Sequence, residues 1–349
     1  MTVLHETPQT RFAASSFAPQ PPEARGLARD EVRLLVATPD GLSHGRFRDL
    51  PDHLHAGDVL VVNTSATVAA EIDADLDGSP VVVHVAHRLD DGGAVVELRT
   101  APDGARAVLT ATTGAVVRVG DVRLVLHAPW PAGSSSPTGS GNRLWRAAVH
   151  GDLDRQLHWN GRPIAYGYLD RRYPLEDYQT VFGTRPGSAE MASAGRPFTH
   201  ELVTRLVTAG VQVAPVTLHT GVSSQEAGEA PGPEWYEVTP ASARVINRAR
   251  ADGRRVVAVG TTATRAVESS VRGASVVAGR GWTDRVVTPG APPRVVDGLV
   301  TGWHDPMASH LLLVEAVAGA RLTQAAYDAA VAEGYLWHEF GDSALLLRR

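Results

Sequence analysis

The feature that most restricts the folds open to this chain is a long block without a helical pattern. From about Ala69 to Val149 the sequence shows short β-rich runs, such as "VVVHVAHR", "AVVELRT" and "VRLVLHA", separated by turns rich in glycine and aspartate. Strands at this spacing predict an antiparallel barrel or sandwich.

The remaining sequence predicts an α/β fold. From Phe198 onward, strand-like apolar runs such as "VQVAPVTL" and "RRVVAVG" alternate with helical patterns that begin at Thr199 and at Thr239–Pro240. Two further runs, "EVRLLVATPDG" and "GDVLVVNTSA", precede the β-rich block and also look like buried strands. We therefore predict a mixed, mostly parallel α/β sheet domain built from residues 1–68 and 151–349. An antiparallel β-barrel-like domain of residues 69–150 is inserted into it.

Composition removes several classes of chemistry. The 349 residues include no cysteine, which excludes disulfides, thiolate metal sites and cysteine nucleophiles. All 33 basic residues are arginine, so a Schiff-base lysine and a Walker-type phosphate lysine are excluded as well. There is no HExxH pattern, and the pairs His53-x-His55 and His84-x-x-His87 lack fitting carboxylate partners, so we predict no metal.

Charge and apolar runs bear on partners and location. The net charge of −5 gives no overall basic field for nucleic acid, although a local arginine face remains possible. No apolar run approaches the roughly 20 residues of a membrane span. The N-terminus lacks the basic start and apolar block of a secretion signal. We expect a cytoplasmic monomer that does not bind membranes.

Ligands of an open α/β sheet bind beyond the carboxyl ends of its strands, and polar residues follow several predicted strands here. They are Asn63 after "VLVV", Thr217 and His219 after "VQVAPV", Thr261 and Thr262 after "VVAVG", and His304 after "VVDGLV". Asp342 precedes the last strand, so the end at which it lies is open.

Thr261 and Thr262 follow a strand and a glycine and begin a helix. The free N–H groups of such a helix start favour an oxyanion or a ribose hydroxyl, and the alternative is that a threonine only caps the helix. Arg265 lies one turn further along. It either binds a ligand carboxylate in a bidentate manner or pairs with Glu268 at i+3.

Two histidines and an aspartate are candidates for catalysis. His219 begins a long polar loop rich in glycine and proline, and His304 precedes the next helix; either could act as an acid or base, or lie on the surface. Asp297 is either a catalytic carboxylate or a turn residue before glycine. Tyr236 could stack on a base or pack in the core.

Several segments together resemble one family. "RRVVAVGTTATRAVES", "VTLHTG", "EWYEV", "RVVDGLVTGWHDP", "LLLVEAVAG" and a final "GD" before an apolar strand occur in the order and spacing of the S-adenosylmethionine:tRNA ribosyltransferase-isomerase family of queuosine biosynthesis. "FRDLPDHLHAGDVLVVN" and "GSAEMASAGRPFT" resemble it too. The resemblance runs from about Asp30 to the end and is weakest in the β-rich block.

The resemblance implies an α/β domain with an inserted β-barrel, in agreement with the pattern analysis. It implies transfer of the ribosyl part of S-adenosylmethionine to 7-aminomethyl-7-deazaguanine in tRNA, rearrangement of the sugar, and release of adenine and methionine. S-adenosylmethionine would be a consumed substrate, tRNA the partner, and no metal would be needed. The predicted catalytic residues are His219, His304 and Asp297. The predicted substrate-binding residues are Asn63, Thr217, Glu234, Tyr236, Thr261, Thr262, Arg265 and Asp342.

The sequence departs from the family at particular positions. The family's "N-(N/D)-T-R-V-x-x-A-R" is here "NTSATVAAE", which leaves Ala66 and Glu71 in place of arginines. The family's "GSVAAPTAGLHFT" is here "GSAEMASAGRPFT", with Pro197 in place of the histidine. Two alternatives therefore stand beside the family reaction: ribosyl transfer to a small acceptor other than tRNA, and a nucleoside-binding protein without turnover.

Overall fold

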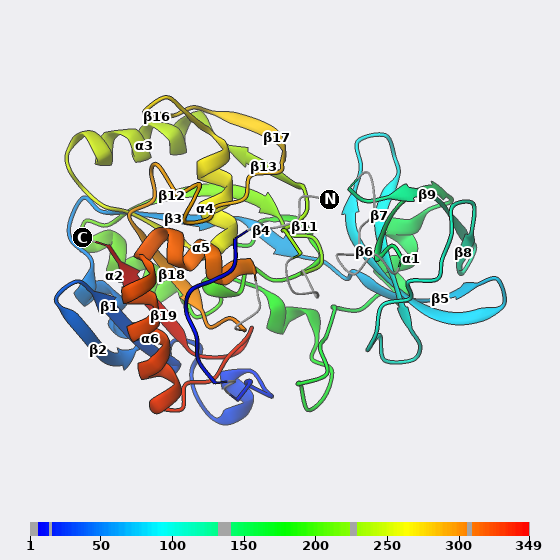
Figure 1. Cartoon of the computed structure of the whole chain (residues 1–349), viewed down its shortest axis with the longest axis horizontal. Helices are drawn as coiled ribbons and strands as arrows, with labels where there is room; N and C mark the ends of the chain where they lie inside the picture. The colour runs from blue at the N-terminus through cyan, green and yellow to red at the C-terminus, as the bar shows by residue number, and fades with distance from the viewer. Residues whose placement is uncertain (1–5, 14–15, 132–140, 224–228, 306–308, 349) are drawn as a thin grey trace.

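The computed structural model describes residues 6–13, 16–131, 141–223, 229–305 and 309–348. Figure 1 shows a sheet covered by helices at one end of the molecule and a barrel at the other. No helix in these ranges is long and apolar enough to cross a membrane.

The larger part is a nine-stranded mixed sheet in the order β17-β13-β12-β3-β14-β18-β19-β1-β2. Its strands are β1 (Arg33–Thr38), β2 (Gly41–Arg46), β3 (Val59–Asn63), β12 (Gln212–His219), β13 (Glu234–Val238), β14 (Val256–Val259), β17 (Gly279–Thr283), β18 (Gly298–Gly302) and β19 (Ser343–Leu347). The central strands β12, β3, β14 and β18 run parallel. The strands β13, β17 and β2 at the two edges pair antiparallel, and β19 runs antiparallel to β18 but parallel to β1.

Helices cover both faces of the sheet, so its strands are apolar on both sides. The helices are α2 (His200–Thr208), α3 (Pro240–Ala251), α4 (Gly260–Ser269), α5 (Ser309–Ala318) and α6 (Ala320–Ala332), and the largest 3₁₀ segment is η3 (Phe47–His53). Along β14, Val256 and Ala258 pack in the core with α3 to α6, whereas Val257 and Val259 pack in the core with α2 and η3. This alternation explains the continuous apolar runs of the sequence.

The helix starts follow the local signals in the sequence. The Thr199 hydroxyl accepts a hydrogen bond from the Leu202 N–H at the start of α2, and the Thr239 hydroxyl accepts one from Ser242 N–H at the start of α3. Both predicted starts are confirmed, because a threonine side chain satisfies an N–H group that has no partner within the helix.

The second part is a closed six-stranded antiparallel barrel in the order β10-β7-β6-β5-β8-β9. Its strands are β5 (Glu71–Leu76), β6 (Ser79–Arg88), β7 (Ala94–Thr100), β8 (Val116–Val119), β9 (Val122–Pro129) and β10 (Leu144–His150). The predicted fold class, a mixed α/β sheet with an inserted antiparallel barrel, is confirmed. Small strands β4 (Ser65–Thr67) and β11 (Arg185–Ser188) pair in parallel beside the sheet, and β15 (Val271–Arg272) pairs with β16 (Ser275–Val276).

The helix α1 (Leu153–Asn160) follows the last barrel strand directly. Its Leu153 and Leu157 side chains are buried in the hydrophobic core of the barrel. The division of the chain at residue 150 stays a prediction, and on this packing we propose that the inserted segment extends through α1.

The segment leading into β18 depends on one buried carboxylate. Glu268, near the end of α4, accepts hydrogen bonds from the backbone N–H groups of Arg294 (2.9 Å), Val295 (2.8 Å) and Val296 (3.1 Å). We expect Glu268→Ala to lower the free energy of unfolding by about 2–4 kcal/mol, because buried N–H groups would lose their acceptor. Urea denaturation measures this. The exposed Asp90→Ala is the control and should change stability by less than about 0.5 kcal/mol.

Candidate active site

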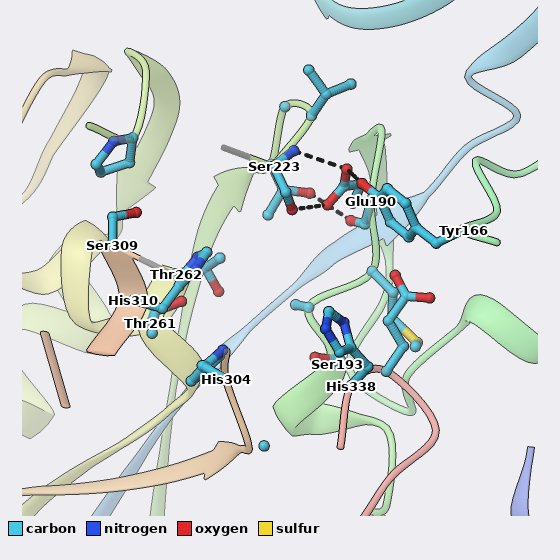
Figure 2. A pocket seen from close by; sticks show the side chains of 18 of the residues that line it. Tyr166, Glu190, Ser193, Ser223, Thr261, Thr262, His304, Ser309, His310 and His338 are labelled. Atoms are coloured by element: carbon cyan, nitrogen blue, oxygen red, sulfur yellow. Dashed lines mark hydrogen bonds between the residues drawn. The ribbon is translucent and has the colours of Figure 1, made fainter. Parts of the chain in front are cut away.

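A cavity of about 580 Å³ opens at the sheet edge where β12, β14 and β18 end, between the sheet and the barrel. The sheet part contributes the start of α4, the loop after β12 and the segment after β18; the barrel contributes His84, Arg99 and Gly104. Figure 2 shows Thr261, Thr262, His304 and His310 on one side of the cavity and Tyr166 and Glu190 on the other. The predicted position of a site, beyond the carboxyl ends of parallel strands, therefore coincides with a real cavity.

The start of α4 forms part of the cavity wall. Gly260 has a φ of +88°, which favours glycine, and a Cβ atom there would lie 3.2 Å from the Ala194 Cβ. The helix is preceded by Val259 and has no side-chain cap, so the interpretation of the threonines as caps is wrong. Thr261 and Thr262 both line the cavity.

Asn63 does not line the cavity but positions Thr262. Its Nδ2 donates to the Leu218 carbonyl (2.9 Å) and to the Thr262 hydroxyl (3.1 Å), and its Oδ1 accepts from the Leu218 N–H (3.0 Å). The amide thereby joins the ends of β3 and β12 to the start of α4.

Arg265 lines the cavity and pairs with Glu234 on β13. Its Nη2 donates to the Gly232 carbonyl (2.9 Å) and its Nε to the Arg285 carbonyl (3.0 Å). The predicted alternative of a pair with Glu268 is wrong, because that carboxylate is bound to the backbone of the segment before β18. Burial raises the pKa of Glu234, while the charge of Arg265 opposes that shift.

His304 lies in the cavity and is joined there by a histidine that the sequence analysis missed. The His304 and His310 rings stack with centroids 5.0 Å apart, and His304 Nε2 lies 3.0 Å from the Thr301 hydroxyl. Burial lowers the pKa of His304 well below its usual value and that of His310 to about 4, with smaller contributions from the neighbouring histidines and, for His310, from Arg265. Both rings are therefore neutral at pH 7 and available as proton acceptors.

His219 and Thr217 lie near the cavity but not on its wall. His219 Nδ1 lies 2.7 Å from the Ser65 hydroxyl, and its ring stacks on Trp235 with centroids 5.2 Å apart. Burial lowers the pKa of His219, and the charge of Arg185 lowers it further. The Thr217 hydroxyl lies 2.9 Å from that of Thr64.

Three other predicted residues are not on the cavity wall. Asp297 lies before β18, at the opposite edge of the parallel strands, where its carboxylate accepts from the Val256 N–H (3.1 Å). Asp342 accepts from the Arg33 and Leu336 N–H groups, each at 2.8 Å. Tyr236 is buried in the core of the sheet. The positions of these side chains do not support contact with a ligand.

A second set of side chains that the sequence analysis missed lines the cavity opposite the α4 start. They are Tyr166, Tyr168, Glu190, His338 and Glu339. For Glu190 the sequence offered one indication, its place in the segment "GSAEMASAG". The other four residues lie in loops that show no strand-end pattern.

The barrel end of the cavity contains a buried ion network. His84 Nε2 lies 3.0 Å from Glu71 and its Nδ1 3.5 Å from Glu97, while Glu97 also pairs with Arg99 (2.7 Å) and Arg143 (3.1 Å). Burial opposes these charges, yet hydrogen bonds and nearby cations lower the pKa of both carboxyl groups to about 2 and raise that of His84.

Comparison with known proteins identifies the family. The family model described as "Queuosine biosynthesis protein" matches residues 9–346, nearly the whole chain. This chain belongs to the queuosine biosynthesis protein family. The family inferred from the sequence motifs is thereby confirmed.

Its relatives in the queuosine family match over almost their whole lengths. The S-adenosylmethionine:tRNA ribosyltransferase-isomerase of Thermus thermophilus is 37% identical, with 91% of this chain and 93% of the relative covered. That of Deinococcus radiodurans is 38% identical, with 99% and 94% covered. A crystal structure of S-adenosylmethionine tRNA ribosyltransferase from Thermotoga maritima is 27% identical, with 98% and 99% covered and a TM-score of 0.49.

The ion network predicts a pH dependence of stability. The lowered pKa values of Glu71 and Glu97 stabilise the fold above their usual value of 4.5, and this contribution is lost as the pH falls towards 2. The raised pKa of His84 stabilises the fold below 6.5, and that contribution is lost as the pH rises through the folded-state value. Urea midpoints measured across pH should fall in both directions.

The variant His84→Gln distinguishes the decrease in stability at low pH from the decrease at high pH. It should lose the decrease on the alkaline side and keep the decrease on the acid side, because Glu97 retains its arginine partners. An unchanged alkaline limb in this variant would contradict the role given to His84.

Proposed function

We propose that this chain transfers and isomerises the ribosyl group of S-adenosylmethionine onto 7-aminomethyl-7-deazaguanine in tRNA, with release of adenine and methionine. The observation that carries the proposal is the polar cavity at the carboxyl edge of the sheet, in a chain that belongs to the queuosine family. Its volume of about 580 Å³ is within the range of small-molecule sites.

The reaction needs a base that removes a proton from the carbon next to the sulfonium. His304 and His310 are suitable because both are neutral at pH 7 and both line the cavity. The Thr301 hydroxyl fixes the orientation of the His304 ring. We assign proton removal to this histidine pair.

The reaction also needs donors for the departing adenine and for the alkoxides that form. The Thr261 hydroxyl lines the cavity, and no described residue forms a hydrogen bond with it. The N–H groups at the start of α4 favour negative charge at the same place. Arg265, held by Glu234, adds a fixed positive charge beside them.

A second candidate function is ribosyl transfer to a small deazapurine acceptor. Glu71 stands where the family motif has an arginine, and Arg162 (2.6 Å) and Arg172 (2.7 Å) pair with it. The charges of Arg162 and Arg172 are therefore neutralised by Glu71 within the protein. Less positive charge remains to bind phosphates, which favours an acceptor with fewer phosphates than tRNA.

The deciding experiment incubates the pure protein with S-adenosylmethionine and, separately, tRNA carrying the precursor base or free 7-aminomethyl-7-deazaguanine. Adenine release is followed by chromatography. Release with tRNA alone supports the first function, and release with the free base alone supports the second. Binding of S-adenosylmethionine without adenine release would contradict both and indicate a nucleoside-binding protein.

Thr261→Val tests the ligand-facing side of α4. The variant keeps the shape of the side chain and removes its hydroxyl, so we expect the Kd for S-adenosylmethionine to rise roughly fivefold, about 1 kcal/mol. Isothermal titration calorimetry measures the Kd. The exposed Thr204→Val on α2 should leave it unchanged. Equal Kd values for both variants and the wild type would remove Thr261 from the site.

A further inference from the structure

One wall of the cavity presents a carboxylate that is held firmly in place by neutral donors. Glu190 accepts hydrogen bonds from the Tyr166 hydroxyl, the Ser223 hydroxyl and the Ser223 backbone N–H, the last at 2.9 Å. Figure 2 shows these contacts, which join side chains from three separate segments of the chain. The carboxylate is oriented before any ligand arrives, which reduces the entropic cost of binding.

Glu190 lacks the cationic partner that three other carboxylates around the cavity have. Glu234 pairs with Arg265, and Glu71 and Glu97 pair with arginines at the barrel end. Within the described part of the chain, no arginine or histidine lies within 4.0 Å of the Glu190 carboxylate. A carboxylate that faces a cavity without a counter-ion favours a cationic ligand.

The side chains beside Glu190 favour a cation as well. The Tyr166 and Tyr168 rings stack with centroids 6.1 Å apart, and aromatic faces attract cations. Glu339 accepts from the Tyr168 hydroxyl (3.4 Å) on the same wall. Burial, with a contribution from the charge of Glu190, raises the pKa of Glu339 to about 8.

We propose that Glu190 is the residue that binds a primary ammonium group of a substrate in this cavity. Such a group donates up to three hydrogen bonds, and Glu190 has acceptor capacity left after its three protein contacts. The inference rests on the proposed function, in which two substrates carry a primary amine: S-adenosylmethionine, in its methionine part, and 7-aminomethyl-7-deazaguanine.

Binding of matched ligand pairs tests the proposal without turnover. The first pair is 7-aminomethyl-7-deazaguanine and 7-cyano-7-deazaguanine, which lacks the amine. The second is S-adenosylhomocysteine, which has the amine but no sulfonium, and 5′-methylthioadenosine, which has neither. Calorimetry gives the Kd of each for the wild type, for Glu190→Gln and for the exposed control Glu176→Gln on the 3₁₀ segment η4 (Leu175–Tyr178).

Glu190→Gln should weaken the amine ligand of one pair roughly 10- to 100-fold, because a charge-assisted hydrogen bond is lost. The amine-free ligand of that pair should change less than about twofold. The pair that responds identifies the source of the ammonium group. An equal loss for both ligands of each pair, no loss for either, or no binding of either amine by the wild type would overturn the proposal.

A proton count gives a second readout. A cation placed beside Glu339 lowers the pKa of that carboxyl from about 8, so binding of the amine at pH 7.5 should release protons, measured by calorimetry in buffers of different ionisation enthalpy. Glu339→Gln should abolish the release, and an unchanged proton count in the wild type would contradict the placement. Adenine release by the wild type is measured separately, so the proposed function and this inference can fail independently.

Discussion

The arrangement of the two parts depends on one buried carboxylate at the place where the chain passes between them. Glu71, the first residue of β5, exchanges two backbone hydrogen bonds of 2.9 Å with Arg162, where the chain returns from the barrel. Its fully buried side chain pairs with Arg162, Arg172 and His84. A buried charge without partners costs several kcal/mol, so these ion pairs hold together the two points at which the chain enters and leaves the barrel. The barrel is thereby fixed against the sheet. The cavity is lined by residues of both parts.

The same carboxylate explains a departure that looks like a loss in the sequence alone. Glu71 stands where the family motif has an arginine, but two arginines from the returning segment contact it. The arginines at the junction come from other positions of the chain, and Glu71 neutralises part of their charge. Arg196, beside Pro197, is likewise buried, where it pairs with Glu23 (3.0 Å) and packs over the Phe340 ring. Its charge serves the fold and does not line the cavity.

The sequence predicted the features that depend on residues close together in the chain. Caps at Thr199 and Thr239, the glycine at Gly260 and the apolar strands each depend on near neighbours in the chain. Thr261 and His304 were predicted to follow strand ends, and both line the cavity there. The remaining contacts depend on distant segments. Arg265 pairs with a residue 31 positions away rather than three, and Glu190 is held by Tyr166 and Ser223 from two other loops. Asp297 and Asp342 could be placed only once the strand directions were known, and both bind backbone N–H groups instead of facing the cavity.

The two sides of the cavity differ in charge in a way that suits a cationic substrate. On the sheet side the histidine pair is neutral and Arg265 is balanced by Glu234, so that side carries little net charge. On the opposite side Glu190 has hydrogen-bond donors but no counter-ion among the described residues. A ligand cation is therefore attracted to the Glu190 side of the cavity. The low pKa values of His304 and His310 keep both imidazoles neutral, so that neither repels this cation and both can accept a proton. The charge difference across the cavity thus separates cation binding from proton transfer.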